Sequence, residues 1–177
     1  RTPIFAEMVN IINNIEVEFA EFKFEEIAVR NTLSNYYYGN NRAITKSMIT
    51  WWAFQDEQQK LIPLETKLEI EHIFAKNRQE IERSLKNPKN IESLGNKCLL
   101  EKRVNIRASD YRFADKKKYY YGFTNSKGQI KEGTKIYELI KLSDTQLDFA
   151  ENDITKRKES ILESFIAYLK DNHLLKE

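Results

Sequence analysis

The spacing of apolar residues changes near Lys67, and this change limits the folds that the chain can adopt. Before it, apolar residues such as Ile44, Met48 and Trp52 recur every three or four positions, which is typical of amphipathic helices. In "KLEIEHIF" (67–74) apolar and polar residues alternate, and alternation predicts a β-strand. Helical spacing returns toward the C-terminus. The pattern predicts an α+β fold, predominantly helical, with a small strand-containing insert packed among amphipathic helices.

Amphipathic helices are predicted on both sides of this insert. Asn40 or Asn41 is expected to cap the helix that contains the two tryptophans, because an asparagine side chain accepts hydrogen bonds from the first free N–H groups. Gly39 is expected to end the helix before it. The predicted helices cover roughly 4–22, 25–38, 40–57, 134–142 and 152–171.

The insert itself is predicted to run from strand to loop to strand to helix. After the polar segment 76–90, "IESLGNKCLLEKRVN" (91–105) is expected to be a strand or extended loop interrupted by Gly95. "YRFADKKKYYYGF" (111–123) is expected to be helical up to its glycine, and "NSKGQIKEG" (125–133) to form a loop or small hairpin.

At 177 residues the chain is expected to form one domain. A helical lead-in is assigned to 1–65, the core insert to 66–122 and C-terminal helices to 123–177. The hydrophobic share of 41% and the charged share of 32% indicate a globular and not a disordered protein. Because the first residue is Arg1 and not Met, the chain is expected to be a piece of a longer polypeptide.

No apolar run approaches the ~20 residues of a membrane span, so no membrane association is expected. The one cysteine, Cys98, cannot form an internal disulfide, which favours a reducing compartment such as the cytoplasm. Its thiol is interpreted as a small buried hydrophobe in preference to a nucleophile or a metal ligand. The sequence leaves the oligomeric state open.

Basic residues gather in two segments, 97–107 and 115–123, and the second segment also contains three consecutive tyrosines. The net charge of +2 is too small to indicate nucleic-acid binding by itself, and lysine runs are usually solvated faces. Interleaved lysines and tyrosines also suit a surface that contacts a nucleic-acid backbone. The candidate nucleic-acid-binding residues are Lys97, Lys102, Arg103, Arg107, Lys116 and Lys117.

Glu71 and His72 close the first strand of the insert, and Asn96 and Asn105 follow in its second half. Phosphodiester hydrolysis needs a base for the attacking water and a cation near the charge that develops on the leaving group. A neutral imidazole suits the first task near pH 7, and carboxylate and amide oxygens suit Mg²⁺. The other histidine, His173, lies in the C-terminal tail, which argues against a zinc cluster.

Each candidate also has a structural interpretation. A histidine at a strand end is more often a packed residue, and a Gly-Asn pair is a common turn. Neighbouring residues of a regular strand point to opposite faces. Glu71 and His72 can therefore share a site only where the strand ends or twists.

The order of these residues is similar to that of a known nuclease motif. "EHIFA", "LGNKCLL" and "VN" resemble the HNH, or His-Me finger, pattern, which reads Asp/Glu-His-Ile-x-Pro, then Asn, then a helix-borne Asn or His. The longer blocks "IEHIFAKN", "SLGNKCLLEKRVNIRAS", "YRFADKKKYY" and "DITKRKESI" resemble the C-terminal HNH domain of GmrSD-type, modification-dependent restriction endonucleases. "NRAITKSMITWW" resembles the helical lead-in of that family. The resemblance covers roughly residues 40–170.

The resemblance implies a ββα-metal fold for the insert and a role for each candidate. His72 would be the general base that activates water. Glu71 and Asn105 would hold one Mg²⁺, with Mn²⁺ as an alternative, and Asn96 would fix the loop and the orientation of His72. Lys116 falls in the family's aromatic-x-x-Lys block, where a phosphate contact is expected.

The implied function is a metal-dependent HNH DNA endonuclease domain that hydrolyses phosphodiester bonds of foreign, modified DNA in a restriction or antiphage defence protein. Such proteins carry this domain behind an N-terminal ParB-like NTPase domain, which is the expected partner domain of the same chain. Two positions depart from the pattern: Ala75 stands where the family has proline, and Glu71 where aspartate is common. They leave open a catalytically silent HNH-fold module that binds DNA or a partner. A purely structural helical interaction domain would instead pack His72 in its core.

Overall fold

The structure is a computed structural model of the 177-residue chain, and it describes Asn13 and residues 23–176. The helix predicted at 4–22 lies outside the described residues. The chain divides into two compact units, one of residues 1–35 with 162–177 and the other of residues 36–161. The domain boundaries proposed from the sequence stay a prediction.

The first unit contains α2 (Glu26–Asn35) and the last ten residues of α8 (Glu151–Asp171). Arg30 binds Glu26 one turn earlier on α2 and both carboxylate oxygens of Glu163 on α8. These ion pairs are largely exposed, and exposed pairs contribute little stability. The second unit holds every candidate residue of the core insert.

The centre of the second unit is a pair of antiparallel strands, β1 (Leu68–His72) and β2 (Lys97–Glu101). Their register sets Glu71 opposite Cys98 and His72 opposite Lys97. Every residue of β2 is buried, which explains why this strand has an apolar run at its centre and not an alternating pattern. The strand predicted in "KLEIEHIF" is confirmed, and so is the burial of Cys98.

Helix α5 (Lys102–Ala108) begins directly after β2. The expectation of a strand or loop through residue 105 is wrong for this part. Val104 and Ala108 are buried and lie four positions apart, which is the spacing of one helix face. The chain therefore runs strand, strand, helix, with Asn105 on the helix.

Helix α3 (Ala43–Ala53) packs against β2 and buries Met48, Ile49 and Ala53. The predicted cap is wrong, because the residue at the N-cap is Arg42 and no side chain caps the helix. Asn40 is used elsewhere: its Nδ2 donates to the carbonyl oxygen of Ile70 on β1 at 3.1 Å. Its Oδ1 accepts a hydrogen bond from Nζ of Lys97 on β2 at 2.7 Å.

The connection between β1 and β2 contains α4 (Lys76–Glu82) and two short 3-10 helices, Pro88–Glu92 and Leu94–Asn96. Gly95 in this connection lies against the backbone of α8, where a Cβ atom would stand only 1.9 Å from the carbonyl oxygen of Ile154. Arg157, also on α8, donates to the carbonyl oxygens of Gly95 and Lys97 at 3.0 and 2.8 Å. The close approach of α8 thus fixes the segment that enters β2.

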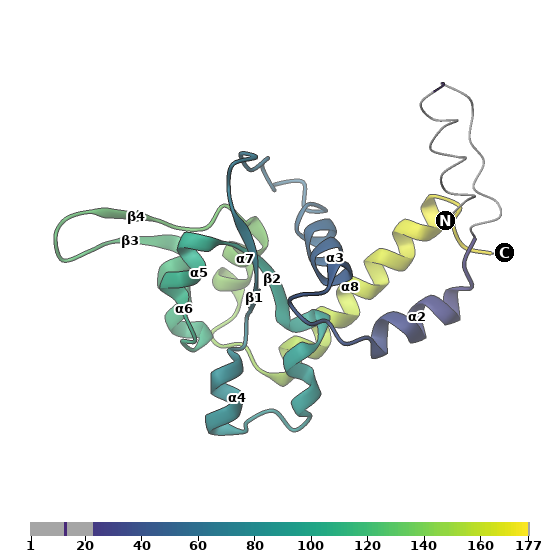
Figure 1. Cartoon of the computed structure of the whole chain (residues 1–177), viewed down its shortest axis with the longest axis horizontal. Helices are drawn as coiled ribbons and strands as arrows, with labels where there is room; N and C mark the ends of the chain where they lie inside the picture. The colour runs from purple at the N-terminus through teal and green to yellow at the C-terminus, as the bar shows by residue number, and fades with distance from the viewer. Residues whose placement is uncertain (1–12, 14–22, 177) are drawn as a thin grey trace. The chain divides into compact units, whose positions relative to one another are not determined.

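The remaining elements are α6 (Phe113–Tyr121), the hairpin β3 (Gly122–Thr124) and β4 (Ile130–Glu132), α7 (Tyr137–Thr145) and α8. The predicted helices and hairpin in this region are confirmed. In Figure 1 the hairpin extends past α5 and α6. The described chain is α+β, with helices around two small antiparallel sheets. No helix within the described residues is long and apolar enough to cross a membrane.

Candidate functional site

Glu71 and His72 leave the end of β1 on opposite faces of the strand pair, as their alternation requires. His72 contacts Lys97, its cross-strand neighbour, while Glu71 contacts Lys116 of α6. Both residues nevertheless line one open cavity of about 450 Å³, together with Asn105 of α5. The end of β1 therefore brings together the three residues expected to act on a phosphodiester.

The imidazole of His72 lies in a buried charged cluster. Its Nε2 is 2.5 Å from Lys97 Nζ and 3.4 Å from Glu92 Oε1. Lys97 Nζ also donates to Glu92 Oε2 at 2.5 Å and to Asn40 Oδ1 at 2.7 Å. An ammonium group has three protons and no lone pair, so each proton of Lys97 has one acceptor here. Nε2 is then the acceptor nitrogen of a neutral imidazole, whose own proton is on Nδ1.

Burial, and next the positive charge of Lys97, lower the pKa of His72 from 6.5 to about 4, although Glu92 opposes this change. Burial also lowers the pKa of Lys97, and the hydrogen bond and charge of Glu92 partly offset that effect. His72 is therefore neutral at pH 7, which is the state that a general base requires.

This environment predicts a pH dependence of stability. The folded state holds the pKa of His72 at about 4, below its ordinary value of 6.5, so the unfolded chain binds more protons between these values. Stability from His72 is full above pH 6.5 and is lost as the pH falls toward 4, with a total on the order of 3 kcal/mol. Urea denaturation in EDTA at several pH values measures the free energy of unfolding of the parent and of His72→Gln. The difference in unfolding free energy between the two proteins should change between pH 6.5 and 4. A constant difference would show that the pKa of His72 is not lowered by folding.

Glu71 and Asn105 each have one polar side-chain atom held in place by a neighbour, an oxygen of Glu71 and the nitrogen of Asn105. Lys116, whose side chain is fully buried, donates to Glu71 Oε1 at 2.6 Å and to the carbonyl oxygen of His72 at 2.7 Å. Asn105 Nδ2 donates to Glu69 Oε2 at 3.0 Å, so the amide is oriented by its nitrogen end. Glu71 Oε2 and Asn105 Oδ1 accept no hydrogen bond from the residues that the structure describes.

The donor set at this cavity fits a hard divalent cation. One carboxylate oxygen and one amide oxygen, completed by water, are the ligands that Mg²⁺ prefers. The described residues contain no group of three or more His, Cys, Asp or Glu side chains that could hold a metal ion.

Asn96 fixes the segment that leaves β1. Its side chain is buried, accepts from Phe74 N at 2.7 Å, and donates to the carbonyl oxygens of Phe74 and Ile91 at 3.1 and 3.0 Å. Ile73 N donates to the carbonyl oxygen of Asn96 at 3.0 Å. Ala75, the next residue in this turn, has φ −64°, which is the angle that proline imposes. The turn forms here without a proline because Asn96 holds its backbone.

Residues 21–164 match the family model described as "GmrSD restriction endonucleases, C-terminal domain". The chain belongs to this family. The matched range includes β1, β2, α5 and all of the candidate site residues. No curated protein and no solved structure matches the chain. The family resemblance noted in the sequence is confirmed, and membership indicates the nuclease module of a restriction endonuclease, with DNA as its class of substrate.

In this GmrSD C-terminal domain the candidate basic residues lie in three different settings. Lys97 and Lys116 are fully buried in ion pairs, which favours a structural role over a direct contact with phosphate. Lys117 lies over the ring of Phe113, with Nζ 5.9 Å from the ring centroid. Lys102, Arg103 and Arg107 are on α5 and line a second cavity.

The sequence did not reveal three residues that support the site of this GmrSD domain. Glu92 and Asn40 complete the cluster around Lys97, and Glu69 orients Asn105. The sequence pattern could have identified Glu69, because residues alternate between the two faces of a strand and Glu69 therefore shares a face with Glu71. Glu92 and Asn40 meet Lys97 only through the register of the strands and the position of the loops.

Proposed function

We propose that this GmrSD C-terminal domain is a metal-dependent DNA endonuclease with a ββα-metal active site at the end of β1. The observation that carries the proposal is the cavity of about 450 Å³ that Glu71, His72 and Asn105 line together. It supplies a neutral imidazole and two oriented oxygen ligands within one open space. Hydrolysis of a phosphodiester needs these groups together.

Glu71 Oε2 and Asn105 Oδ1 would hold Mg²⁺, or Mn²⁺ in its place. When bound, such a cation stabilises negative charge that develops on the phosphate and on the leaving oxygen. Lys116 contributes by holding the other oxygen of Glu71, and Glu69 contributes by holding the nitrogen of Asn105. These two contacts orient the ligands before a cation arrives, which limits the reorganisation that binding requires.

His72 acts as the general base through Nδ1. For this, the ring changes tautomer: the Nδ1 proton passes to solvent, Nε2 takes up a proton and donates it to Glu92 Oε1, an atom already 3.4 Å away, and Lys97 no longer donates to the ring. Nδ1 then accepts a proton from the attacking water, and the carboxylate of Glu92 stabilises the imidazolium that forms. Lys97 stays bound to Asn40 and to Glu92 Oε2 during this exchange. Asn96 keeps the backbone that follows His72, at Ile73 and Phe74, in position.

The biological setting that we propose follows from membership in the family. The target is foreign, modified DNA, and the setting is a restriction or antiphage defence protein of the cytoplasm. An N-terminal ParB-like NTPase domain of the same polypeptide would select the substrate. The buried thiol of Cys98 is compatible with a reducing compartment.

Incubation of the domain with supercoiled plasmid in Mg²⁺, Mn²⁺ or EDTA tests the proposal. Nicking or linearisation is expected with either cation and not in EDTA. Asn105→Ala is expected to weaken Mn²⁺ binding, measured by calorimetry, by at least ~10-fold, since even changes beyond the direct ligands have such effects. Asn172→Ala, at the end of α8, is the matched control. Cleavage in EDTA at an unchanged rate would contradict the metal dependence.

The contact between Lys97 and His72 Nε2 favours a second candidate function, a DNA-binding module that does not cut. In this case His72 Nε2 keeps its hydrogen bond from Lys97. The protein then retards DNA in a gel without cleaving it under any of these conditions. Retardation that weakens with added salt, in the absence of nicking, would select this function over the first.

A further inference from the structure

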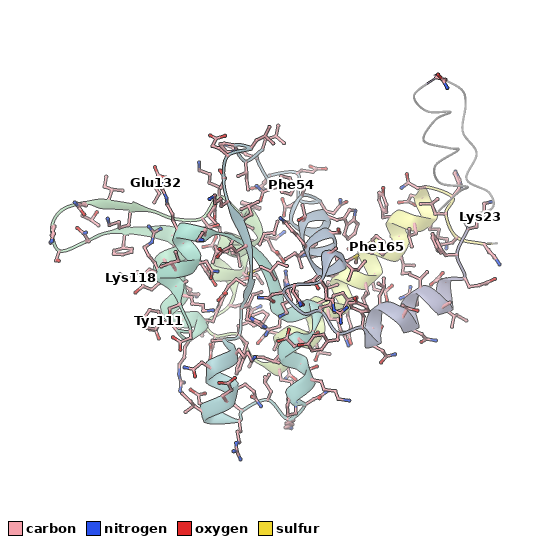
Figure 2. All side chains as sticks on the ribbon, in the orientation of Figure 1. Lys23, Phe54, Tyr111, Lys118, Glu132 and Phe165 are labelled. Carbon is pink, nitrogen blue, oxygen red and sulfur yellow. The ribbon has the colours of Figure 1, made fainter. Side chains whose placement is uncertain are left out.

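A second open cavity, of about 920 Å³, lies between α5 and the β3–β4 hairpin. We call it the hairpin groove. In Figure 1 the hairpin runs beside α5 and projects beyond it, and Figure 2 labels Glu132 on the hairpin and Lys118 on α6. The basic residues that line the groove are Lys67, Lys102, Arg103, Arg107, Lys131 and Lys135. The acidic residues that line it are Glu65, Glu101 and Glu132, so positive charge dominates.

The charges of the groove are only partly neutralised by the protein. Glu101 is buried and accepts hydrogen bonds from Thr134 Oγ1 and from Lys135 N, each at 2.6 Å. Its carboxylate therefore binds the segment that follows β4 and not a basic side chain of the groove. Within the described part of the chain, Lys67, Arg103 and Lys135 form no ion pair. Lys102 has only a long contact of 3.7 Å with Glu69 while half exposed, a geometry that contributes little. A groove with this charge excess attracts a polyanion.

Arg107 connects the two walls of the groove. Its Nη2 donates to the carbonyl oxygen of Glu132 on β4 at 2.5 Å, which ties the hairpin to α5. Its Nε is enclosed and has no hydrogen-bond partner among the described residues. The guanidinium thus lines the groove without an acidic partner among the described residues.

The hairpin groove adjoins the cavity of the proposed active site. Ile106 lines both cavities, and it stands on α5 between Asn105, a proposed metal ligand, and Arg107. The exposed side chain of Ile106 is thus shared by the groove and by the cavity that Glu71 and Asn105 line. This continuity distinguishes the groove from a basic patch elsewhere on the surface.

We propose that the hairpin groove binds the sugar–phosphate backbone of duplex DNA next to the scissile phosphate. The inference rests on the proposed nuclease function and names the surface by which the domain holds its substrate. Six of the lining residues are cationic, and contacts of cationic side chains to phosphate position DNA without reading its sequence. The groove therefore gives affinity and register, and it leaves the choice of sequence or modification to other parts of the protein.

The test is fluorescence anisotropy of a labelled duplex of about 30 base pairs with the 177-residue chain in EDTA, at several salt concentrations. The groove variant is Arg103→Gln with Lys131→Gln. The control variant, Lys46→Gln with Lys89→Gln, removes the same charge from exposed positions outside the groove. The groove variant should weaken binding by about 10- to 100-fold and reduce the salt slope by about 2, equally for unrelated sequences. The control should remain within about 3-fold of the parent, as expected for charges that touch no phosphate.

Equal losses in both variants, or none in either, would overturn the groove assignment, as would a parent that binds no duplex. Cleavage assays on the same proteins test the nuclease proposal independently of the groove. If the parent cleaves DNA and the groove variant binds DNA as tightly as the parent, only the assignment of the groove as a DNA-binding surface is wrong. If the parent binds through the groove and does not cut with any metal, the groove stands and the nuclease proposal fails. With both correct, the groove variant raises KM more than it lowers kcat.

Discussion

Replacing Lys97 with methionine is expected to lower the free energy of unfolding by about 3–5 kcal/mol, the usual effect of removing one partner from a buried ion pair. The Lys97 side chain is fully buried, and its three protons go to Glu92, His72 and Asn40. Methionine has nearly the same shape and cannot donate, so the change leaves the Glu92 carboxylate with no cation. An uncompensated buried charge is more costly than the loss of packing.

Urea denaturation of the parent and Lys97→Met measures this difference. Lys102→Met is the matched control, because Lys102 is half exposed and lies 3.7 Å from its acidic partner, and it should change stability by less than about 1 kcal/mol. The double variant Lys97→Met with Glu92→Met should recover part of the loss, since it removes the stranded charge. Equal stabilities for Lys97→Met and Lys102→Met would show that the cluster around His72 is not the buried ion pair described here.

Patterns within short segments predicted much of this fold. The change of spacing near Lys67 located β1, and helical spacing located α3, α7 and α8 within a few residues. Each of these elements has a repeated apolar face, and burial of that face determines its structure. The longer sequence blocks that contain Glu71, His72, Asn96 and Asn105 then indicated the GmrSD family, which the family model confirms.

The partners of the site residues depend on distant parts of the chain, and no local pattern specifies them. Lys97 looked like a surface lysine in a basic segment, yet the register of β2 against β1 sets it opposite His72. Asn40 or Asn41 was expected to cap a helix, and Asn40 instead accepts a hydrogen bond from Lys97, 57 positions later. Lys116 reaches Glu71 across 45 positions. Strand register and helix packing create these contacts, so the sequence supplied candidate residues for the site and not their electrostatic environment.

The second large effect is expected at His72. Changing His72 to alanine should reduce metal-dependent cleavage by about 10²- to 10⁴-fold, the usual contribution of a general base. The fold should remain, because Lys97 keeps two acceptors, Glu92 and Asn40, after the imidazole is removed. Circular dichroism and urea denaturation check that the variant is folded. His173→Asn is the matched control, since His173 has φ 55° and asparagine tolerates this left-handed conformation.

The most direct test of the nuclease assignment is the initial rate of supercoiled plasmid conversion in Mg²⁺ by the parent, His72→Ala and His173→Asn. The account predicts cleavage by the parent, an equal rate for His173→Asn, and a rate at least about 100-fold lower for folded His72→Ala. If His72→Ala cut as fast as the parent, His72 would not be the base, and the active site would have to lie elsewhere in the chain.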